Sequence, residues 1–255
     1  MNRHELLARL HEDLQPRTYL ETGINTGRSL SLSRASSVGI DPEFSITEEV
    51  QADVHLARTS SDEFFARRRP LAHLPVPVVD LAFVDGMHLA EYALRDVVAV
   101  ERFTSATSVL VIDDVLPRKV VMANRKRSTT RWTGDVYKAT AALRTLRPDL
   151  VVVEIDTQPT GTCVLMLPDA ARGGVLPGYD DWVATTAVLP DPQDVPAEVL
   201  QRTRAMAPEE FLAAVDWTRW RRARQQGEGL AGARTLLEDL IRKNDELTSR
   251  VAPGA

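Results

Sequence analysis

Acidic residues follow several short apolar runs of this sequence, in positions that suit chemistry at one end of a sheet. Asp85 ends the run that begins at residue 79, and Asp113 and Asp114 end the run that begins at residue 108. In a parallel sheet the carboxyl ends of neighbouring strands lie side by side, so these three carboxylates should converge on one crevice. Two carboxylates about 4 Å apart repel by roughly 4 kcal/mol at an effective dielectric constant of about 20, and a divalent cation would relieve that repulsion.

We therefore expect a metal ion at Asp85, Asp113 and Asp114. Hard oxygen donors without a cysteine favour Mg²⁺, with Mn²⁺ or Ca²⁺ as alternatives, and argue against structural zinc. His88 lies three residues after Asp85, and either residue is a candidate to accept a proton from a substrate. Other interpretations stay open: Asp114 caps a helix entered at Pro117, Asp85 is held neutral or hydrogen-bonded, and His88 is a solvated loop residue.

A glycine turn follows the first apolar run. Glu21, Gly23 and Gly27 form the pattern E-x-G-x-x-x-G, which predicts a sharp turn into a helix. Glycines let a ligand approach the backbone, and the free N–H groups of a helix start can receive an anion. Asp41 follows Glu21 by 41 − 21 = 20 residues, a spacing at which an acid meets ribose hydroxyls. We expect these residues and Thr26 to bind a nucleotide-like cofactor, unless Glu21 caps local backbone and Asp41 merely starts a turn.

Ser61 and Asp62 follow the third apolar run, in the sequence Thr-Ser-Ser-Asp-Glu. One interpretation is that this cluster caps a helix that starts near Glu63. The other is that Ser61 and Asp62 face the adenine edge of a nucleoside that lies across the sheet.

Residues 131–138 contain two candidate contacts to a substrate. Trp132, beside Gly134, could form a wall over the acceptor site, and Lys138 could offer a cation to an anionic acceptor. Asp135 is expected to cap the following helix. The basic run 125–127 is interpreted as a solvated face.

The elements that must position these residues follow from hydrophobic periodicity. From residue 18 to about 167, runs rich in Val, Ile and Leu alternate with amphipathic stretches, which predicts an α/β fold with a mostly parallel sheet. A helix is expected over 89–102. The last link, 156–161, is too short for a helical crossover, so the seventh strand should be antiparallel. Strands are expected at 18–21, 37–41, 54–57, 79–85, 108–113, 150–155 and 162–167.

Three regions are predicted: a cofactor-binding domain over 1–167, a Pro- and Gly-rich wrapping segment over 168–207, and a C-terminal helical extension over 208–255. Two helices are expected in the last region, at 208–226 and 230–250, separated by glycines. Heptad spacing over 230–251, with Asn244 among the apolar positions, predicts either a homodimer through a coiled coil or a helix packed on its own domain. The heptad positions are Leu230, Ala233, Leu237, Leu240, Asn244, Leu247 and Val251.

Composition narrows the classes of function. The chain has 255 residues and a net charge of −5, which gives no general support for nucleic-acid binding. No apolar segment reaches the roughly 18 residues of a membrane span, and no signal peptide is recognised, so a cytoplasmic location is expected. Cys163 is the single cysteine and should be a buried, inert thiol.

The glycine turn, Asp41 and the acids at the strand ends resemble those of class I S-adenosylmethionine-dependent methyltransferases over about residues 15–167. Asp85-Gly86-Met87-His88 followed by Glu91 is most similar to the metal-dependent O-methyltransferases of the macrocin group. The resemblance implies a Rossmann-like, doubly wound seven-stranded sheet, S-adenosylmethionine as cofactor, and Mg²⁺ (or Mn²⁺) on the three acids, which would bind a small-molecule hydroxyl of sugar or natural-product type. The alternatives are a non-catalytic nucleoside-binding module and an enzyme of the same fold with different chemistry, similar to cephalosporin hydroxylation.

Overall fold

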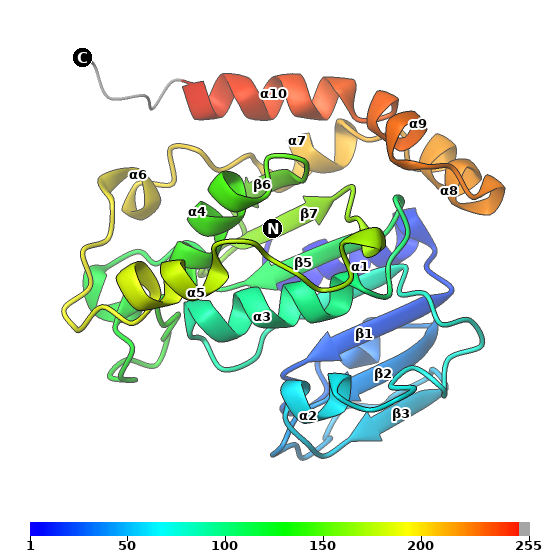
Figure 1. The fold of residues 1–255 in the computed structure, drawn as a ribbon, viewed down its shortest axis with the longest axis horizontal. Coiled ribbons are helices and arrows are strands. Elements are labelled where there is room, and N and C mark those ends of the chain that lie inside the picture. Colours follow the sequence, from blue (N-terminus) through cyan, green and yellow to red (C-terminus); the bar gives the residue numbers. More distant parts are fainter. Residues whose placement is uncertain (250–255) are drawn as a thin grey trace.

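Seven strands form one sheet in the order β3-β2-β1-β4-β5-β7-β6 in a computed structural model, which describes residues 1–249 (Figure 1). The pairs β1·β2, β1·β4, β2·β3 and β4·β5 are parallel. The last strand in sequence, β7, is antiparallel to both of its neighbours, as expected from the short link before it. The strands are β1 Thr18–Thr22, β2 Ser36–Ile40, β3 Val54–Ala57, β4 Leu81–Val84, β5 Val109–Asp113, β6 Val151–Ile155 and β7 Thr162–Met166.

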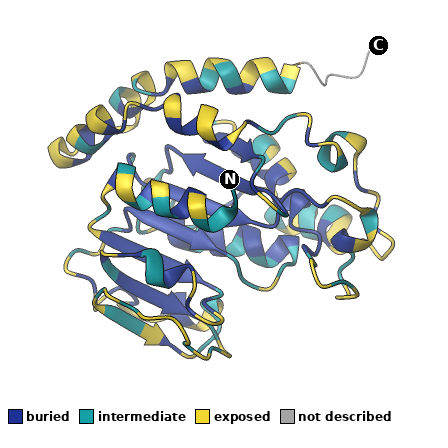
Figure 2. Cartoon of the chain, turned by 180° about the vertical axis from the view of Figure 1, so that it is seen from behind, coloured by how far each residue is buried: buried dark blue, intermediate teal, exposed yellow. Residues whose placement is uncertain are grey.

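Both faces of the sheet are covered, so the strands are apolar on both sides (Figure 2). Side chains alternate along each strand: Leu110 and Ile112 point into one core, and Val109 and Val111 point into the other. The first core includes residues of α2 (Ser61–Phe65), α3 (Ala90–Glu101) and α4 (Tyr137–Leu146). The second includes residues of α1 (Arg3–Leu14), α7 (Pro208–Ala213), α8 (Trp217–Gln226), α9 (Leu230–Thr235) and α10 (Glu238–Ser249).

Helix α1 was not expected, although its signals are in the sequence. Asn2 and Glu5 form a capping box, in which the Asn2 side chain accepts hydrogen bonds from His4 N and Glu5 N. Leu6, Leu7, Leu10 and Leu14 are fully buried against the sheet. This packing places Asn2, Arg3 and His4 at the carboxyl ends of the strands, where the candidate site lies.

The prediction of a helix directly after the glycine turn is wrong. Between β1 and β2 the structure has only a short 3₁₀ turn, Leu30–Leu32. Serine hydroxyls compete here with helical hydrogen bonding: Ser31 Oγ donates to Arg28 O at 2.8 Å, and Ser33 Oγ hydrogen-bonds with the Ser37 hydroxyl at 3.0 Å.

The segment 168–207 contains only short elements, as its prolines indicate. They are a 3₁₀ turn at Ala170–Arg172, α5 (Tyr179–Trp182), a π-helical turn at Val183–Ala187 and α6 (Ala197–Leu200). The segment is held to the first core, for example by Tyr179, whose hydroxyl donates to Glu91 O at 2.9 Å.

Each of the two long C-terminal helices expected from the sequence is split in two. The Asp216 side chain accepts a hydrogen bond from Arg219 N and starts α8 anew after α7, and the second helix breaks between α9 and α10. Ala233, Leu237 and Leu240 are fully buried in the second core, and Asn244 Nδ2 donates to Val152 O at 3.1 Å. The heptad face therefore packs on its own domain; Val251, its last position, lies outside the described residues. None of the helices within residues 1–249 is long and apolar enough to cross a membrane.

Candidate functional site

A cavity of about 900 Å³ opens at the carboxyl ends of β1 to β5. This volume is at the upper end of the range for small-molecule sites, so a cofactor and a second small molecule fit together. Its walls come from the loops after these strands and from the start of α1. Of the residues singled out in the sequence, those lining it are Gly23, Asp41, Ser61, Asp62, Asp85, His88, Asp114 and Trp132.

Gly23 is where the backbone needs glycine. Its φ is +84°, and a Cβ there would lie 2.0 Å from the carbonyl oxygen of Asp85. The turns after β1 and β4 are therefore in direct contact at the floor of the cavity. Gly27 also has a positive φ, +82°, but a Cβ there would meet the flexible side chain of Ile46. Among the described residues, the cavity lining includes Asn25 and Arg28 but neither Thr26 nor Gly27, whose contact with a cofactor stays a prediction.

Asp41 and Glu21, both predicted to bind the cofactor, lie in different environments. Asp41 lines the cavity, and its carboxylate accepts hydrogen bonds from Asn25 N at 2.8 Å and Glu43 N at 2.7 Å. It thus starts a turn and also ties that turn to the glycine loop. Glu21 instead points into the protein, where the Tyr19 hydroxyl donates to it at 2.8 Å. Burial raises the pKa of Glu21 to about 8. Glu21 is not part of the cavity lining, and its contact with a cofactor stays a prediction.

A second acid, Asp96, lies on the adenine side predicted at Ser61 and Asp62. Ser60 caps α2, as the capping interpretation requires, while Ser61 and Asp62 line the cavity and Asp62 pairs with Arg95. Asp96, on α3, also lines this side although it is only 6% exposed. Burial raises the pKa of Asp96 to about 6. In the sequence, the signal for Asp96 is that an acid stands among the apolar positions of the helix expected over 89–102.

The acid cluster is arranged around His88. Its Nδ1 lies 2.9 Å from Asp114 Oδ2, and its Nε2 lies 3.3 Å from Asp85 Oδ1. Burial lowers the pKa of His88, but hydrogen bonds to the two carboxylates outweigh it and raise the pKa to about 11. His88 and Asp114 both have positive φ, 53° and 61°, which costs backbone energy at non-glycine residues.

Asp113 does not share the cavity with Asp85 and Asp114. Its side chain is 1% exposed and pairs with Arg3 of α1, while its Oδ1 has no hydrogen-bond partner. Asp113 ends β5, whereas Asp114 has left the extended conformation, with a φ of 61°, and only Asp114 of the pair lines the cavity of about 900 Å³. The expected three-carboxylate set is thus corrected: Asp85, His88 and Asp114 each offer a ligand atom, all within 4.8 Å of one another. Arg3 was missed because 110 residues separate it from Asp113.

This donor set fits a divalent cation. Two carboxylates and one imidazole are ordinary ligands for Mn²⁺ and similar ions, and the carboxylates also suit Mg²⁺. The unpartnered oxygen of Asp113 adds a further acceptor behind the cluster.

The loop before α4 supplies the wall of the site. Trp132 stacks on His88, with ring centroids 5.0 Å apart and planes at 6°, and its Nε1 donates to Asn124 O. Gly134 allows this approach, because a Cβ there would lie 1.6 Å from His88 O.

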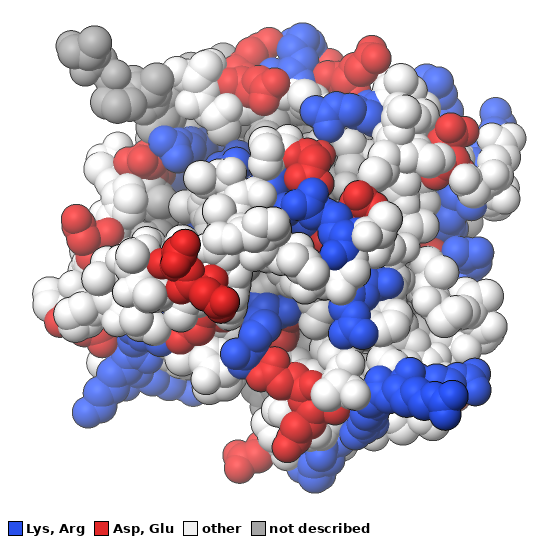
Figure 3. Space-filling view, in the orientation of Figure 1, with Lys and Arg blue, Asp and Glu red and all other residues white. Residues whose placement is uncertain are grey.

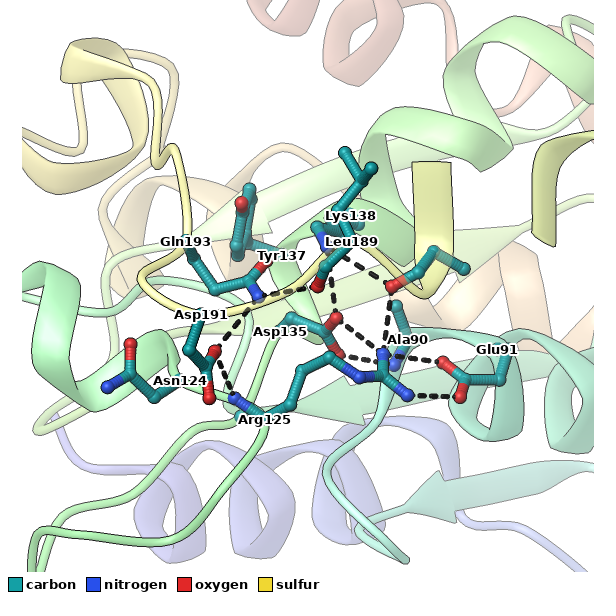
Figure 4. A network of polar contacts seen from close by, with 12 residues as sticks. Ala90, Glu91, Asn124, Arg125, Asp135, Tyr137, Lys138, Leu189, Asp191 and Gln193 are labelled. Atoms are coloured by element: carbon teal, nitrogen blue, oxygen red, sulfur yellow. Dashed lines mark hydrogen bonds and ion pairs between the residues drawn. The ribbon is translucent and has the colours of Figure 1, made fainter. Parts of the chain in front are cut away.

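Lys138 does not reach the cavity. Its Nζ lies 3.1 Å from Asp135 Oδ2 and 3.2 Å from Ala187 O, inside a polar network with Arg125 and Glu91 (Figure 4). Asp135 caps α3 through Ala90 N at 2.9 Å, not α4. Three predictions are therefore corrected: that Lys138 contacts the substrate, that Asp135 caps its own helix, and that Arg125 belongs to a solvated face.

Comparisons with known proteins support the fold. No protein-family model matches the chain, and no curated protein matches its sequence. Among solved structures, the cofactor-bound protein Rv0187 from MTB has a TM-score of 0.50 at 18% identity, over 66% of this chain and 80% of that one. An O-methyltransferase from Streptomyces achromogenes, TomG, has a TM-score of 0.47 at 19% identity, over 65% and 79%. A putative O-methyltransferase from Klebsiella pneumoniae has 0.47 at 16% identity, over the same shares. With its strand order and this likeness to Rv0187, the chain has a Rossmann-like fold with a mostly parallel seven-stranded sheet.

Proposed function

We propose that this protein is an S-adenosylmethionine-dependent O-methyltransferase that acts on a hydroxyl of a small molecule, of sugar or natural-product type, with the help of a divalent metal ion. One observation carries the proposal. A cavity large enough for two small molecules has a glycine turn with Asp41 on one side and the cluster of Asp85, His88 and Asp114 on the other.

The nucleoside half would be held by residues near β1 to β3. Asp41 has lone pairs left for ribose hydroxyls, and Ser61, Asp62 and Asp96 line the side that suits adenine. Arg28 lines the cavity close behind the glycine turn, where its cation suits the carboxylate of the cofactor's amino acid.

The reacting half would be held by the acid cluster. S-adenosylmethionine would supply an electrophilic methyl group, and Mg²⁺ or Mn²⁺ on Asp85, Asp114 and His88 would lower the pKa of the acceptor hydroxyl. Asp85 is placed to hold the proton that the hydroxyl loses, through the carboxylate oxygen that does not bind the metal. His88 is less suited to this role, because its pKa of about 11 leaves it protonated without the metal, and with the metal it would serve as a ligand. Trp132 excludes water and limits the orientations of the acceptor, which supports catalysis through positioning.

Two matched glycine variants test cofactor binding. By calorimetry, the demethylated cofactor S-adenosylhomocysteine should bind in the micromolar range, about −8 kcal/mol. Gly23→Ala should weaken binding, since its Cβ meets backbone of the cavity floor, whereas Gly27→Ala, with nearly the same φ, should weaken it much less. If folded wild-type protein does not bind the ligand, the proposal is wrong.

Methyl transfer is the second test. A screen of sugar, polyketide and catechol hydroxyls by intact mass, with Mn²⁺ or Mg²⁺, should find an acceptor, and excess EDTA should stop turnover. Full activity in EDTA would remove the metal from the proposal. Cofactor binding without transfer to any acceptor would favour the non-catalytic nucleoside-binding module.

A further inference from the structure

Charged side chains are unevenly distributed in the cavity. Arg28 beside the glycine turn, and Asp85 and Asp114 at the ends of β4 and β5, are those that the proposed function assigns to the cofactor and the metal ion. Along the sheet order β3-β2-β1-β4-β5, acids line the side of β2 and β3: Asp41, Glu43 and Asp62. Arg127 and Arg131 line the opposite side, on the loop that follows β5. The proposed methyl donor carries a positive sulfonium, so the acidic side suits the cofactor, and the arginines are left for the other molecule.

The two arginines lack counter-ions. Within residues 1–249, neither Arg127 nor Arg131 forms an ion pair; the guanidinium of Arg127 lies 6.0 Å from the ring of Trp132. Their neighbour Arg125 differs, because it is bound to Glu91 and Asp135 inside the protein. The same loop, between β5 and α4, therefore contains one arginine used for structure and two whose charges remain available at the cavity.

This local charge opposes the charge of the whole chain. The net charge is −5, yet Lys and Arg side chains gather at the lower left of Figure 3, over the loop after β5. Guanidinium groups bind carboxylates and phosphates through paired N–H donors, and they do so more strongly where a cavity wall limits water. Trp132 supplies such a wall, because it stacks on His88 beside these arginines.

We propose that the methyl acceptor is an anion, with a carboxylate or phosphate that Arg127 and Arg131 bind while its hydroxyl lies at the acid cluster. The inference rests on the proposed function and names its substrate class. The sequence predicts that Lys138 offers a cation to an anionic acceptor. The inference assigns this role to two arginines of the loop before α4.

Three catechols that differ only in one substituent test it: protocatechuic acid, its phosphonate analogue and its uncharged primary amide. Their binding is measured by calorimetry on protein saturated with S-adenosylhomocysteine and Mn²⁺. The better anion should bind at least about tenfold tighter than the amide. Comparison of the carboxylate with the phosphonate then tells which anionic group the site prefers.

The double variant Arg127→Gln/Arg131→Gln should bind all three catechols alike, with unchanged affinity for S-adenosylhomocysteine. Lys126→Gln is the matched control: it removes one exposed charge from the same loop, outside the cavity lining, and should keep the preference. Three results would overturn the inference. The amide binds wild type as tightly as both anions, the preference for an anion survives in the double variant, or neither anion binds. Failure of S-adenosylhomocysteine to bind is read separately and counts against the proposed function.

Discussion

Two groups of charged side chains, the network of Figure 4 and the cavity cluster, differ in how completely their charges are matched. In the network of Figure 4, Arg125 and Lys138 face Glu91 and Asp135, with Ala187 O as a further acceptor for both cations. In the cavity cluster, Asp85 and Asp114 share His88, and the buried Asp113 beside them pairs with Arg3. One oxygen of Asp113 is unpartnered, and His88 and Asp114 have positive φ.

The difference separates a structural brace from a candidate site. The network joins the start of α3, the loop before α4, α4 itself and the turn at Val183–Ala187, and each of its charges has an opposite partner. The cavity cluster has more acids than cations and faces a ligand-sized space. Sequence spacing finds both groups but does not distinguish them, because the difference lies in which partners arrive from elsewhere in the chain.

The largest effect should come from Asp135→Asn in the matched network. The substitution leaves Arg125 and Lys138 with Glu91 alone, and removal of one member of a buried ion pair costs about 3–5 kcal/mol. Denaturant unfolding should show this loss, and Asp114→Asn in the same assay should destabilise the protein by much less. If the two variants lose equal stability, the proposed difference between the groups does not hold.

Glu21 extends the comparison to a buried acid with no cationic partner. Burial raises its pKa from the ordinary 4.5 of a glutamate to about 8 in the folded protein. The folded state therefore holds the proton more tightly, so this group's contribution to stability is complete below pH 4.5 and is lost as the pH rises through 8.

Glu21→Gln should remove this dependence and leave the variant more stable than wild type at pH 9 by about 2–4 kcal/mol. At pH 4 the two proteins should have similar stability. Unfolding curves at both pH values check this, and a constant difference between the proteins across that range would contradict the assigned pKa.

Asp114→Asn should weaken metal binding at the cavity cluster by at least about tenfold, because it removes a charged ligand. The electron paramagnetic resonance of titrated Mn²⁺ measures this without turnover. Glu48→Gln, an exposed acid outside the cavity lining, is the control and should bind Mn²⁺ like wild type. Equal Mn²⁺ affinity in Asp114→Asn would place any metal elsewhere.

The smallest effect should come from a single neutral hydrogen bond. Asn244→Ala removes the bond to Val152 O and should cost about 1 kcal/mol in unfolding free energy. Light scattering should show the same oligomeric state as wild type, because the Asn244 side chain is engaged within its own chain. A change of oligomeric state would revive the coiled-coil interpretation; a homodimer through another face stays a prediction.

Local patterns in the sequence were sufficient to predict the strands of the sheet and the acids at their carboxyl ends. Strand positions were predicted to within a residue or two at most ends, and the antiparallel last strand followed from a link too short for a helix. Alternation and turn composition are local properties, so neighbouring residues alone decide them. The same holds for the cap at Ser60 and for the missed cap at Asn2, whose signals span four residues.

Only the tertiary structure decided which charged groups face the cavity. The sequence determined that Asp85, Asp113 and Asp114 end neighbouring strands; packing of α1 brought Arg3 to Asp113, and the backbone turn at His88 put its ring between the other two acids. Likewise, Lys138 was withdrawn into a network whose members span residues 91 to 187. Coulomb interactions and hydrogen bonds depend on distance in space and on burial, and neither can be read from the spacing of residues along the chain.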